Sequence, residues 1–247
     1  MSMRASILNC HGVDDMARTA AEAIVDAARQ AVDDRGRFVV ALSGGNTPRP
    51  LYRLLASAAY RDRLPWALAH VCFGDERMVG PDDARSNYGM ALRELLAQLP
   101  VPLSQVHRIR GEADPRAEAA RYHQELRSIF PDSAVRFDLL LLGMGEDGHT
   151  ASLFPDSPAL LEHGALACAV DVPLPGVARI TLTLPCLNAA RRALFLVTGS
   201  RKADLVRRIA REGERTSALP ASLLRLAQGE LLWIVDGEDA EDAEDAA

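Results

Sequence analysis

Short apolar runs alternate with amphipathic segments along most of this 247-residue chain, and this alternation constrains its fold more than any other feature. The apolar runs have the length of buried strands, and most precede a turn and a segment with helical periodicity. Strands alternating with helices predict β-α-β units and a mainly parallel sheet. The expected strands cover 37–42, 71–73, 137–142, 180–184, 193–197 and 231–235, with a possible edge strand at 6–9. The expected helices cover about 14–32, 48–57, 87–98, 114–129 and 202–211.

This pattern predicts an α/β fold of Rossmann-like type, a single doubly wound, mainly parallel sheet with helices on both faces. No internal repeat or low-complexity linker interrupts residues 1–235, so we expect them to form one domain. Residues 236–247 contain seven acidic and no basic residues. Because such a segment buries little apolar surface, we expect an acidic disordered tail. Removing its seven negative charges changes the formal net charge from −6 to +1.

Composition and charge exclude several classes of protein. No apolar stretch approaches the ~20 residues needed to span a bilayer, and no apolar export segment follows Met1. The four cysteines lack CxxC spacing, so we expect reduced thiols and a cytoplasmic protein. A nearly neutral body with 5% aromatic residues argues against a nucleic-acid partner. No His/Cys cluster has metal-ligand spacing. We expect no metal or cofactor, and a monomer or weak homo-oligomer.

The loop after the strand at 37–42 has the composition of an anion site. Ser43, Gly44, Gly45 and Thr47 precede an expected helix that begins at Pro48. Glycines let backbone N–H groups approach a ligand closely, and the positive end of a helix dipole favours an anion. Thr47 is suited to cap that helix. The loop matches neither the Walker A nor the GxGxxG pattern.

Two further loops carry groups suited to proton transfer. Asp75, Glu76 and Arg77 follow the strand at 71–73, where they form either acid/base machinery or a salt-bridged loop. The glycine-rich segment 143–155 follows the most apolar strand and contains His149 two residues after Asp147. A carboxylate so close can hold the imidazole in one tautomer, and imidazole is the usual group for proton transfer near neutral pH.

Two basic residues complete the group of candidate site residues. Arg179 stands at the start of the 180–184 strand, and Lys202 is the single lysine among 28 basic residues. Lys202 falls at the start of an expected helix, where a cation opposes the helix dipole unless an anion binds beside it. Ligands of doubly wound sheets bind at the carboxyl ends of the strands, where these loops lie. We therefore expect a small phosphorylated substrate and proton transfer without a metal.

These segments together resemble the 6-phosphogluconolactonase family, in order and spacing, from about residue 5 to 235. The matching motifs are SGGNTP (43–48), GDER (74–77), RSNYGMA (85–91), GMGEDGHTASLFP (143–155), RITLT (179–183) and GSRKA (199–203). The resemblance implies a fold related to glucosamine-6-phosphate deaminase and ribose-5-phosphate isomerase. It also implies hydrolysis of 6-phosphoglucono-δ-lactone to 6-phosphogluconate in the oxidative pentose phosphate pathway.

The resemblance also implies roles for individual residues. It assigns the phosphate to Gly44, Gly45, Thr47, Arg179 and Lys202, with Arg77 nearby. It assigns the general base to His149, which Asp147 orients, and it puts Asp75 beside the sugar.

Two alternatives stay open from the sequence. A glucosamine-6-phosphate deaminase/isomerase shares the phosphate loop and the Asp-Gly-His turn, but its turn continues toward a catalytic glutamate that is absent from 151–155. A sugar-phosphate-binding domain without catalysis usually accompanies a DNA-binding segment, for which this chain has no spare region.

Overall fold

The computed structural model describes residues 4–131, 134–172, 176–211 and 213–237. Its main sheet has six strands in the order β1-β9-β8-β5-β2-β3, and every neighbouring pair is parallel. These strands are β1 (Arg4–Cys10), β2 (Phe38–Leu42), β3 (Ala69–Phe73), β5 (Leu139–Gly143), β8 (Arg192–Thr198) and β9 (Glu230–Asp236). The parallel α/β class expected from the sequence is confirmed.

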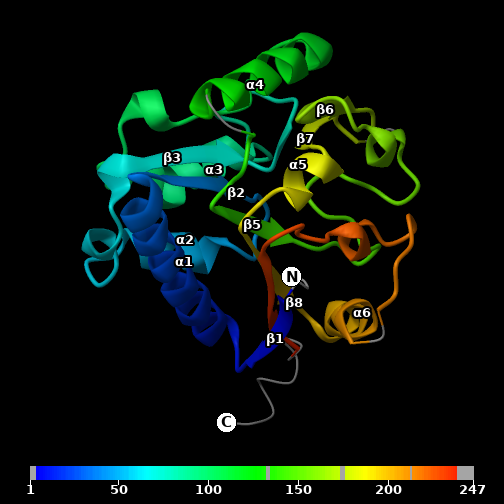
Figure 1. The fold of residues 1–247 in the computed structure, drawn as a ribbon, viewed down its shortest axis with the longest axis horizontal. Helices are drawn as coiled ribbons and strands as arrows, with labels where there is room; N and C mark the ends of the chain where they lie inside the picture. The colour runs from blue at the N-terminus through cyan, green and yellow to red at the C-terminus, as the bar shows by residue number, and fades with distance from the viewer. Residues whose placement is uncertain (1–3, 132–133, 173–175, 212, 238–247) are drawn as a thin grey trace.

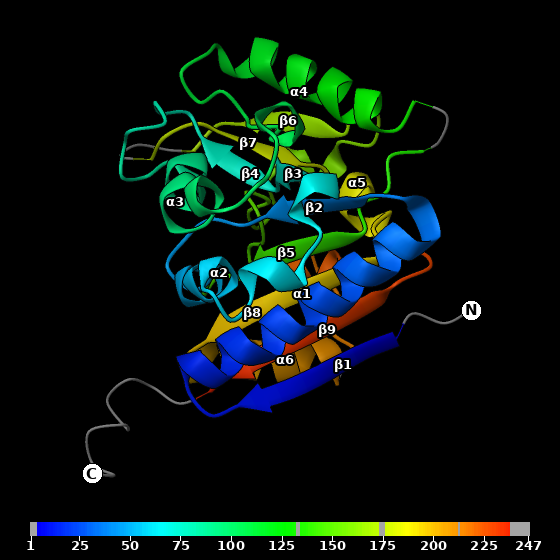
Figure 2. The same ribbon diagram turned by 90° about the vertical axis from the view of Figure 1, so that its left-hand side faces the viewer.

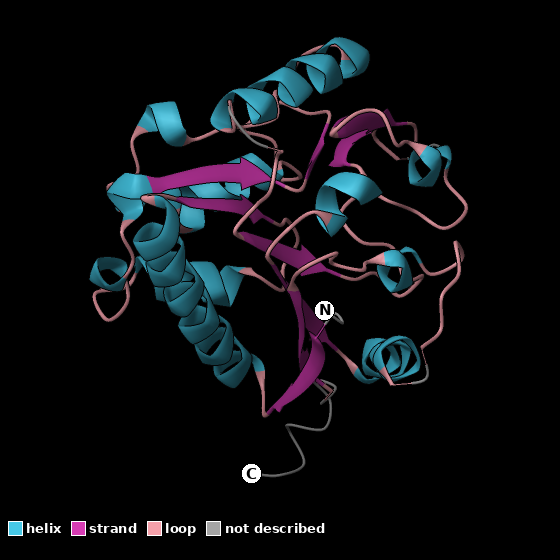
Figure 3. Cartoon of the chain, viewed as in Figure 1, coloured by secondary structure: helices cyan, strands magenta, loops and turns pink. Residues whose placement is uncertain are grey.

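Helices cover both faces of this sheet. The α-helices are α1 (Val13–Arg35), α2 (Arg49–Ala56), α3 (Asn87–Glu94), α4 (Pro115–Ile129), α5 (Leu184–Asn188) and α6 (Ser200–Ala210). Helices α1 and α2 lie on one face and α6 on the other (Figure 1). Figure 2 shows α1 lying in front of the sheet, over β8 and β9, and Figure 3 separates helices from strands by colour. Short 3-10 helices span Arg61–Arg63, Trp66–Leu68, Leu96–Gln98, Leu103–Gln105, Pro158–Leu161 and Pro220–Leu223.

A second, three-stranded antiparallel sheet distinguishes the structure from the single sheet that we expected. It consists of β4 (Asp75–Arg77), β7 (Arg179–Leu182) and β6 (Ala167–Val170), with β7 in the middle. Thus the strand expected at 180–184 does not join the parallel sheet, and the segment expected to be a loop after β3 is itself a strand. Helix α4 packs against β6 and β7 (Figure 1).

The core explains why the apolar runs form strands. The leucines of β5, from Leu139 to Leu142, are all buried, because helices cover both faces of this central strand. In β8 and β9, Phe195 stacks on Trp233 with ring centroids 4.0 Å apart. Burial of an apolar side chain contributes about 1.5–3 kcal/mol, so a strand that is apolar on both faces is stable only where both faces are covered.

The end of the main sheet lies one residue beyond the expected domain boundary. Asp236 is the last residue of β9, pairs with Cys10 and Thr198, and is buried. The tail expected at 236–247 is therefore wrong at Asp236, and its residues from 238 onward lie outside the described residues. Among the described helices, none is both long and apolar enough to cross a membrane.

The strand order brings the predicted loops together. In a parallel sheet all strands end at the same edge, and the chain proceeds from β2 to β3 in one direction but from β5 to β8 in the other. The connections therefore diverge between β2 and β5, which is where ligands bind in open parallel sheets. The segments after β2 and β5 flank this position.

Candidate active site

A cavity of about 330 Å³ opens at the carboxyl ends of β2, β5 and β8. All the predicted site residues except Asp147 line it: Ser43, Gly44, Gly45, Thr47, Asp75, Arg77, His149, Arg179 and Lys202. His149 and Lys202 thus share one cavity although they lie 53 positions apart in the sequence. Leu141, Leu142 and Leu196, at the ends of β5 and β8, contribute apolar walls.

The loop after β2 presents unpaired donors to this cavity. Among the described residues, none accepts a hydrogen bond from the backbone N–H groups of residues 44–47. Gly44 is required for close packing, because a Cβ there would lie 1.7 Å from Oδ1 of Asn87. Thr47 does not cap α2 as predicted. The helix begins at Arg49 with Pro48 at the N-cap position and no side-chain cap, so Thr47 faces the cavity instead.

Three cations lie around the same cavity. Arg77 and Arg179 stand directly opposite each other in the β4–β7 pair, an arrangement of like charges that is normally destabilising. Burial and the nearby Arg77 lower the pKa of Arg179. Neither guanidinium forms an ion pair with a carboxylate of the described residues, and both Nε atoms are buried without a hydrogen-bond partner there. Lys202 adds its charge from the first turn of α6, so the cavity is suited to a dianion.

Asp75 is held by two side chains that the sequence analysis did not select. The Asp75 residue is 6% exposed. Asn87 donates its Nδ2 hydrogen to Oδ1 at 3.0 Å, and Ser152 donates its hydroxyl to Oδ2 at 2.6 Å. Both carboxylate oxygens are therefore fixed, and the side chain has one orientation at the cavity wall. Asn87 and Ser152 stand inside the motifs at 85–91 and 143–155, but only the fold brings them to Asp75.

Glu76 matches neither of the two alternatives left open for its loop, acid/base machinery or a salt bridge with a described residue. It is buried outside the cavity lining, and its carboxylate accepts hydrogen bonds from the backbone N–H groups of Asn87 and Tyr88 at the start of α3. Burial raises its pKa, although these bonds oppose the shift. The Glu76 carboxylate therefore stabilises a helix N-terminus, where a negative charge is favourable.

His149 and Asp147 form a hydrogen-bonded pair at the cavity. Nδ1 of His149 lies 2.6 Å from Oδ1 of Asp147, which also accepts the His149 backbone N–H at 3.1 Å. Burial would raise the pKa of Asp147, but the bonds from His149 outweigh it, so the pKa is lowered. An ionised Asp147 accepts the Nδ1 hydrogen and leaves the Nε2 lone pair free. The His149 side chain is 30% exposed, so this lone pair can reach a ligand or water.

The ring of Phe154 contacts both the His149 imidazole and the Arg179 guanidinium. Its ring centroid lies 4.9 Å from that of the His149 imidazole, and the guanidinium of Arg179 lies 5.3 Å from the same ring. Ala151 lines the cavity with φ of 48°, a conformation that costs a non-glycine residue free energy. A strained residue at this place is typical of a functional site.

We predict that Gly145→Ala disrupts the pair. A Cβ at this position would lie 2.2 Å from Nδ1 of His149 and 2.6 Å from Oδ1 of Asp147, so the imidazole must move. A displacement of about 1 Å can cost ~10²-fold in rate, and we expect kcat to fall at least about tenfold. Gly80→Ala is the matched control, because a Cβ there meets no atom within 4 Å. Equal kcat values for both variants would contradict the prediction.

Metal ligands do not gather in the described part of the chain, where no group of three His, Cys, Asp or Glu side chains is arranged to hold an ion. The chemical groups of the cavity are thus its cations, free backbone amides, a fixed carboxylate and a polarised imidazole.

The chain is similar to a known family of proteins over most of its length. A family model for glucosamine-6-phosphate isomerases/6-phosphogluconolactonase matches residues 12–233. A 6-phosphogluconolactonase of Homo sapiens is 44% identical over 206 residues, which cover 82% of this chain and 79% of that protein. One from Synechocystis is 41% identical over 216 residues, 86% of this chain and 87% of that one. The solved structure of 6-phosphogluconolactonase from Trypanosoma brucei matches all of both chains with a TM-score of 0.81 at 28% identity.

Proposed function

The chain belongs to the family of glucosamine-6-phosphate isomerases and 6-phosphogluconolactonases, and from this membership we infer how its cavity works. Its activity is the hydrolysis of 6-phosphoglucono-δ-lactone to 6-phosphogluconate in the oxidative pentose phosphate pathway. One observation carries the proposed mechanism: a polarised imidazole and three cations, which form no ion pair with the described carboxylates, share a single cavity.

In this mechanism the phosphate binds between the loop after β2 and the cations. The free N–H groups of residues 44–47 donate to phosphate oxygens, and Lys202 and Arg179 neutralise the two negative charges. The negative charge of a phosphate beside Arg179 also reduces the repulsion between Arg179 and the neighbouring Arg77. Binding the phosphate in this way holds the lactone ring in the same cavity as His149.

His149 then acts as the general base. Nε2 takes a proton from a water molecule as its oxygen attacks C1 of the lactone, and the negative charge of the tetrahedral intermediate collects on the carbonyl oxygen. When the bond between C1 and the ring oxygen breaks, the protonated imidazole returns the proton to the leaving ring oxygen. The acid formed at C1 loses its own proton to water. General-base assistance of this kind is worth ~10²–10⁴-fold.

Arg77 is the favoured donor to the intermediate's oxyanion. In the glycine-rich turn, the Gly145 and Gly148 N–H groups already donate to backbone carbonyls of His149 and Gly145. The Arg77 guanidinium donates one hydrogen bond, to the Arg85 carbonyl, and lines the cavity with further N–H groups. A cation is also the more effective stabiliser of a developing negative charge in a partly enclosed site.

Asp147→Asn tests the orienting carboxylate through pH. Because the pKa of Asp147 is lowered on folding, its carboxylate stabilises the folded state at neutral pH, and this contribution is lost as the pH falls from about 4 through the lowered pKa. The variant should therefore be less stable than the wild type near neutral pH, with the difference closing at acid pH. Urea unfolding at both pH values measures it. We also expect kcat to fall at least about tenfold. A stability difference that persists unchanged in acid would contradict this role.

The direct experiment is hydrolysis of freshly prepared 6-phosphoglucono-δ-lactone, followed against the buffer rate because the lactone also opens spontaneously. Unphosphorylated gluconolactone is the control for the phosphate site, and we expect it to react far more slowly. Ammonia release from glucosamine 6-phosphate would instead favour the isomerase branch of the family. Binding of 6-phosphogluconate without any hydrolysis would indicate a binding domain.

The remaining expectations belong to the same proposal. We propose a cytoplasmic enzyme that works as a monomer or weak homo-oligomer, with no nucleic-acid partner, and that residues 1–235 act as one unit. The cavity is formed within one chain, so catalysis needs no second copy. Light scattering across the concentration range of the assay, together with specific activity that does not change with concentration, would support this.

A further inference from the structure

Two buried tyrosines make the same unusual contact at the ends of neighbouring strands. The Tyr52 hydroxyl, from α2, accepts a hydrogen bond from the Ser43 backbone N–H at 3.1 Å and donates one to the Ser43 carbonyl at 2.7 Å. The Tyr122 hydroxyl, from α4, accepts from the Phe73 N–H at 2.9 Å and donates to the Phe73 carbonyl at 2.9 Å. Ser43 follows the last residue of β2, and Phe73 is the last residue of β3.

Each phenol bonds both backbone groups of one residue, the N–H and the carbonyl. Both tyrosines are 0% exposed, and burial raises the pKa of each, so each hydroxyl stays protonated and can donate and accept at once. Strand β3 is the edge of the main sheet, and the outward N–H and C=O groups of an edge strand need partners when they are buried. Further back on the same strand, Val71 has its carbonyl satisfied by the His107 N–H at 2.8 Å.

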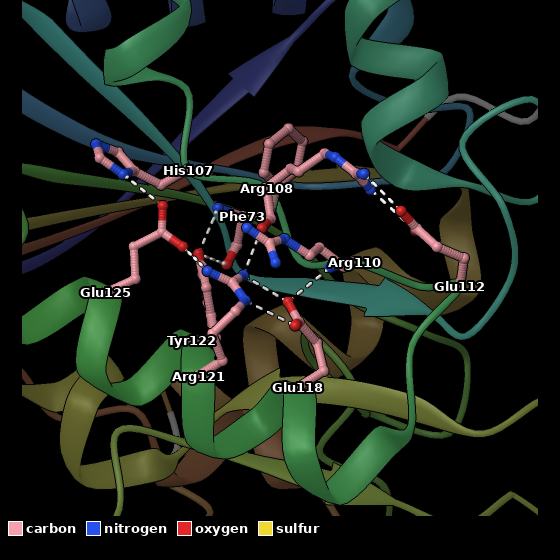
Figure 4. Close-up of polar contacts among 9 residues, drawn as sticks. All are labelled: Phe73, His107, Arg108, Arg110, Glu112, Glu118, Arg121, Tyr122 and Glu125. Carbon is pink, nitrogen blue, oxygen red and sulfur yellow. Dashed lines mark hydrogen bonds and ion pairs between the residues drawn. The ribbon is translucent and has the colours of Figure 1, made fainter.

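Helix α4 is fixed firmly enough to hold its phenol in place. Figure 4 shows the contacts that tie it to the segment following α3. Glu118 accepts from the Arg110 backbone N–H at 2.7 Å, Arg121 donates to the Arg108 carbonyl at 2.9 Å, and Glu125 lies 2.9 Å from Nδ1 of His107. Because this segment itself bonds to β3, the helix and the strand end form one connected unit.

Each held residue leads directly into the cavity. After Phe73, the Gly74 N–H donates to the Leu42 carbonyl and the Gly74 carbonyl accepts from the Leu182 N–H, and the next residue is Asp75. After Ser43 comes the loop at 44–47, whose N–H groups have no partner in the described part of the chain. The Tyr52 bonds are thus the last backbone attachment before the anion loop, and the Tyr122 bonds fix the strand end that leads to Asp75.

We propose that Tyr52 and Tyr122 are positioning residues with separate duties, the first setting the phosphate loop and the second setting Asp75. The inference rests on the proposed function, because it assigns the phosphate to the loop after β2 and the reacting lactone to the side of Asp75 and His149. Neither tyrosine lines the cavity, so each acts through the backbone that it holds.

The test replaces each tyrosine by phenylalanine, which removes one oxygen atom and keeps the ring. For Tyr52→Phe we expect KM and the inhibition constant of 6-phosphogluconate to rise about tenfold with kcat within about twofold. For Tyr122→Phe we expect kcat to fall about tenfold with the inhibition constant nearly unchanged. Tyr60→Phe is the matched control, because the Tyr60 hydroxyl bonds the Glu22 carboxylate, away from the cavity, and we expect both constants to be unchanged.

A second measurement separates failure of this inference from failure of the proposed function. Amide hydrogen exchange should quicken at Ser43 in Tyr52→Phe and at Phe73 in Tyr122→Phe, because each substitution removes the acceptor of that N–H group, whether or not the protein hydrolyses the lactone. If the wild type is inactive but the two variants still show these local changes in exchange, the proposed function is contradicted and the contacts of the two tyrosines are not. If the wild type is active, either of two results would overturn the separate duties. In the first, Tyr52→Phe and Tyr122→Phe show the same changes in KM and kcat; in the second, both variants keep the wild-type constants, as Tyr60→Phe should. If Tyr122→Phe does not fold, Glu118→Gln loosens α4 while keeping the phenol, and we expect a smaller loss of kcat.

Discussion

His149→Ala should lower kcat for the lactone by at least about 100-fold and leave KM nearly unchanged. The imidazole is the group with a free lone pair at the cavity, and Asp147 holds its other nitrogen at 2.6 Å. The phosphate-binding groups lie on other segments of the chain, so the variant should still bind substrate. Initial rates with fresh lactone, corrected for the buffer reaction, measure both constants.

The control for this variant is His163→Ala, which removes an exposed imidazole outside the cavity lining. We expect it to keep the wild-type rate. Nearly full turnover by His149→Ala would reject the general base. A rise in KM at constant kcat would instead make His149 a binding group, because it would show equal interaction with the substrate and the transition state.

Lys202→Ala should raise KM by about 10–100-fold and change kcat little. A hydrogen bond to a charged group contributes about 1.5–3 kcal/mol, and the ammonium is one of three cations around the cavity. The phosphate does not take part in the bond changes, so its binding acts nearly equally on substrate and transition state. Rates over a range of lactone concentration give both constants, and the inhibition constant of 6-phosphogluconate should rise by the same factor.

Arg201→Ala provides the matched control for charge. Arg201 precedes Lys202 in the first turn of α6 and is exposed, so its removal lowers the local positive charge without touching the cavity. We expect its KM to stay within about twofold of the wild type, because exposed charges are screened by solvent and salt. An unchanged KM in Lys202→Ala, or an equal rise in both variants, would show that Lys202 does not contact the phosphate.

The site combines side chains that are fixed by hydrogen bonds with a loop whose backbone donors are unpaired among the described residues. Its carboxylate at Asp75 is fixed by two buried hydrogen bonds, and its base is fixed by a neighbour two positions away. The anion loop, by contrast, keeps its backbone donors unpaired among the described residues. Donors that are already oriented but not yet satisfied bind an anion without first breaking internal bonds.

The sequence by itself determined the features that depend on near neighbours in the chain. Apolar runs of strand length between helical segments predicted the parallel sheet, and the six-stranded sheet confirms this. The prediction needed no knowledge of the partners, because an apolar run is buried in the core whichever elements pack against it. The glycine-rich turn at 143–148 and the Asp147–His149 spacing predicted the polarised imidazole, since the two side chains are only two residues apart. The apolar strand and the turn at 199–200 predicted a helix from about residue 202, and α6 begins at Ser200.

Tertiary structure alone decided the features that depend on partners far away in the sequence. Ser152 reaches Asp75 across 77 positions, and Arg179 faces Arg77 only because β7 pairs with β4 in a second sheet. Likewise Glu76 belongs to the start of α3 and not to the cavity, a choice that its residue type leaves open. The physical reason is that local pattern fixes how a segment buries its own apolar face, whereas the partner of a buried polar group is set by which strands become neighbours.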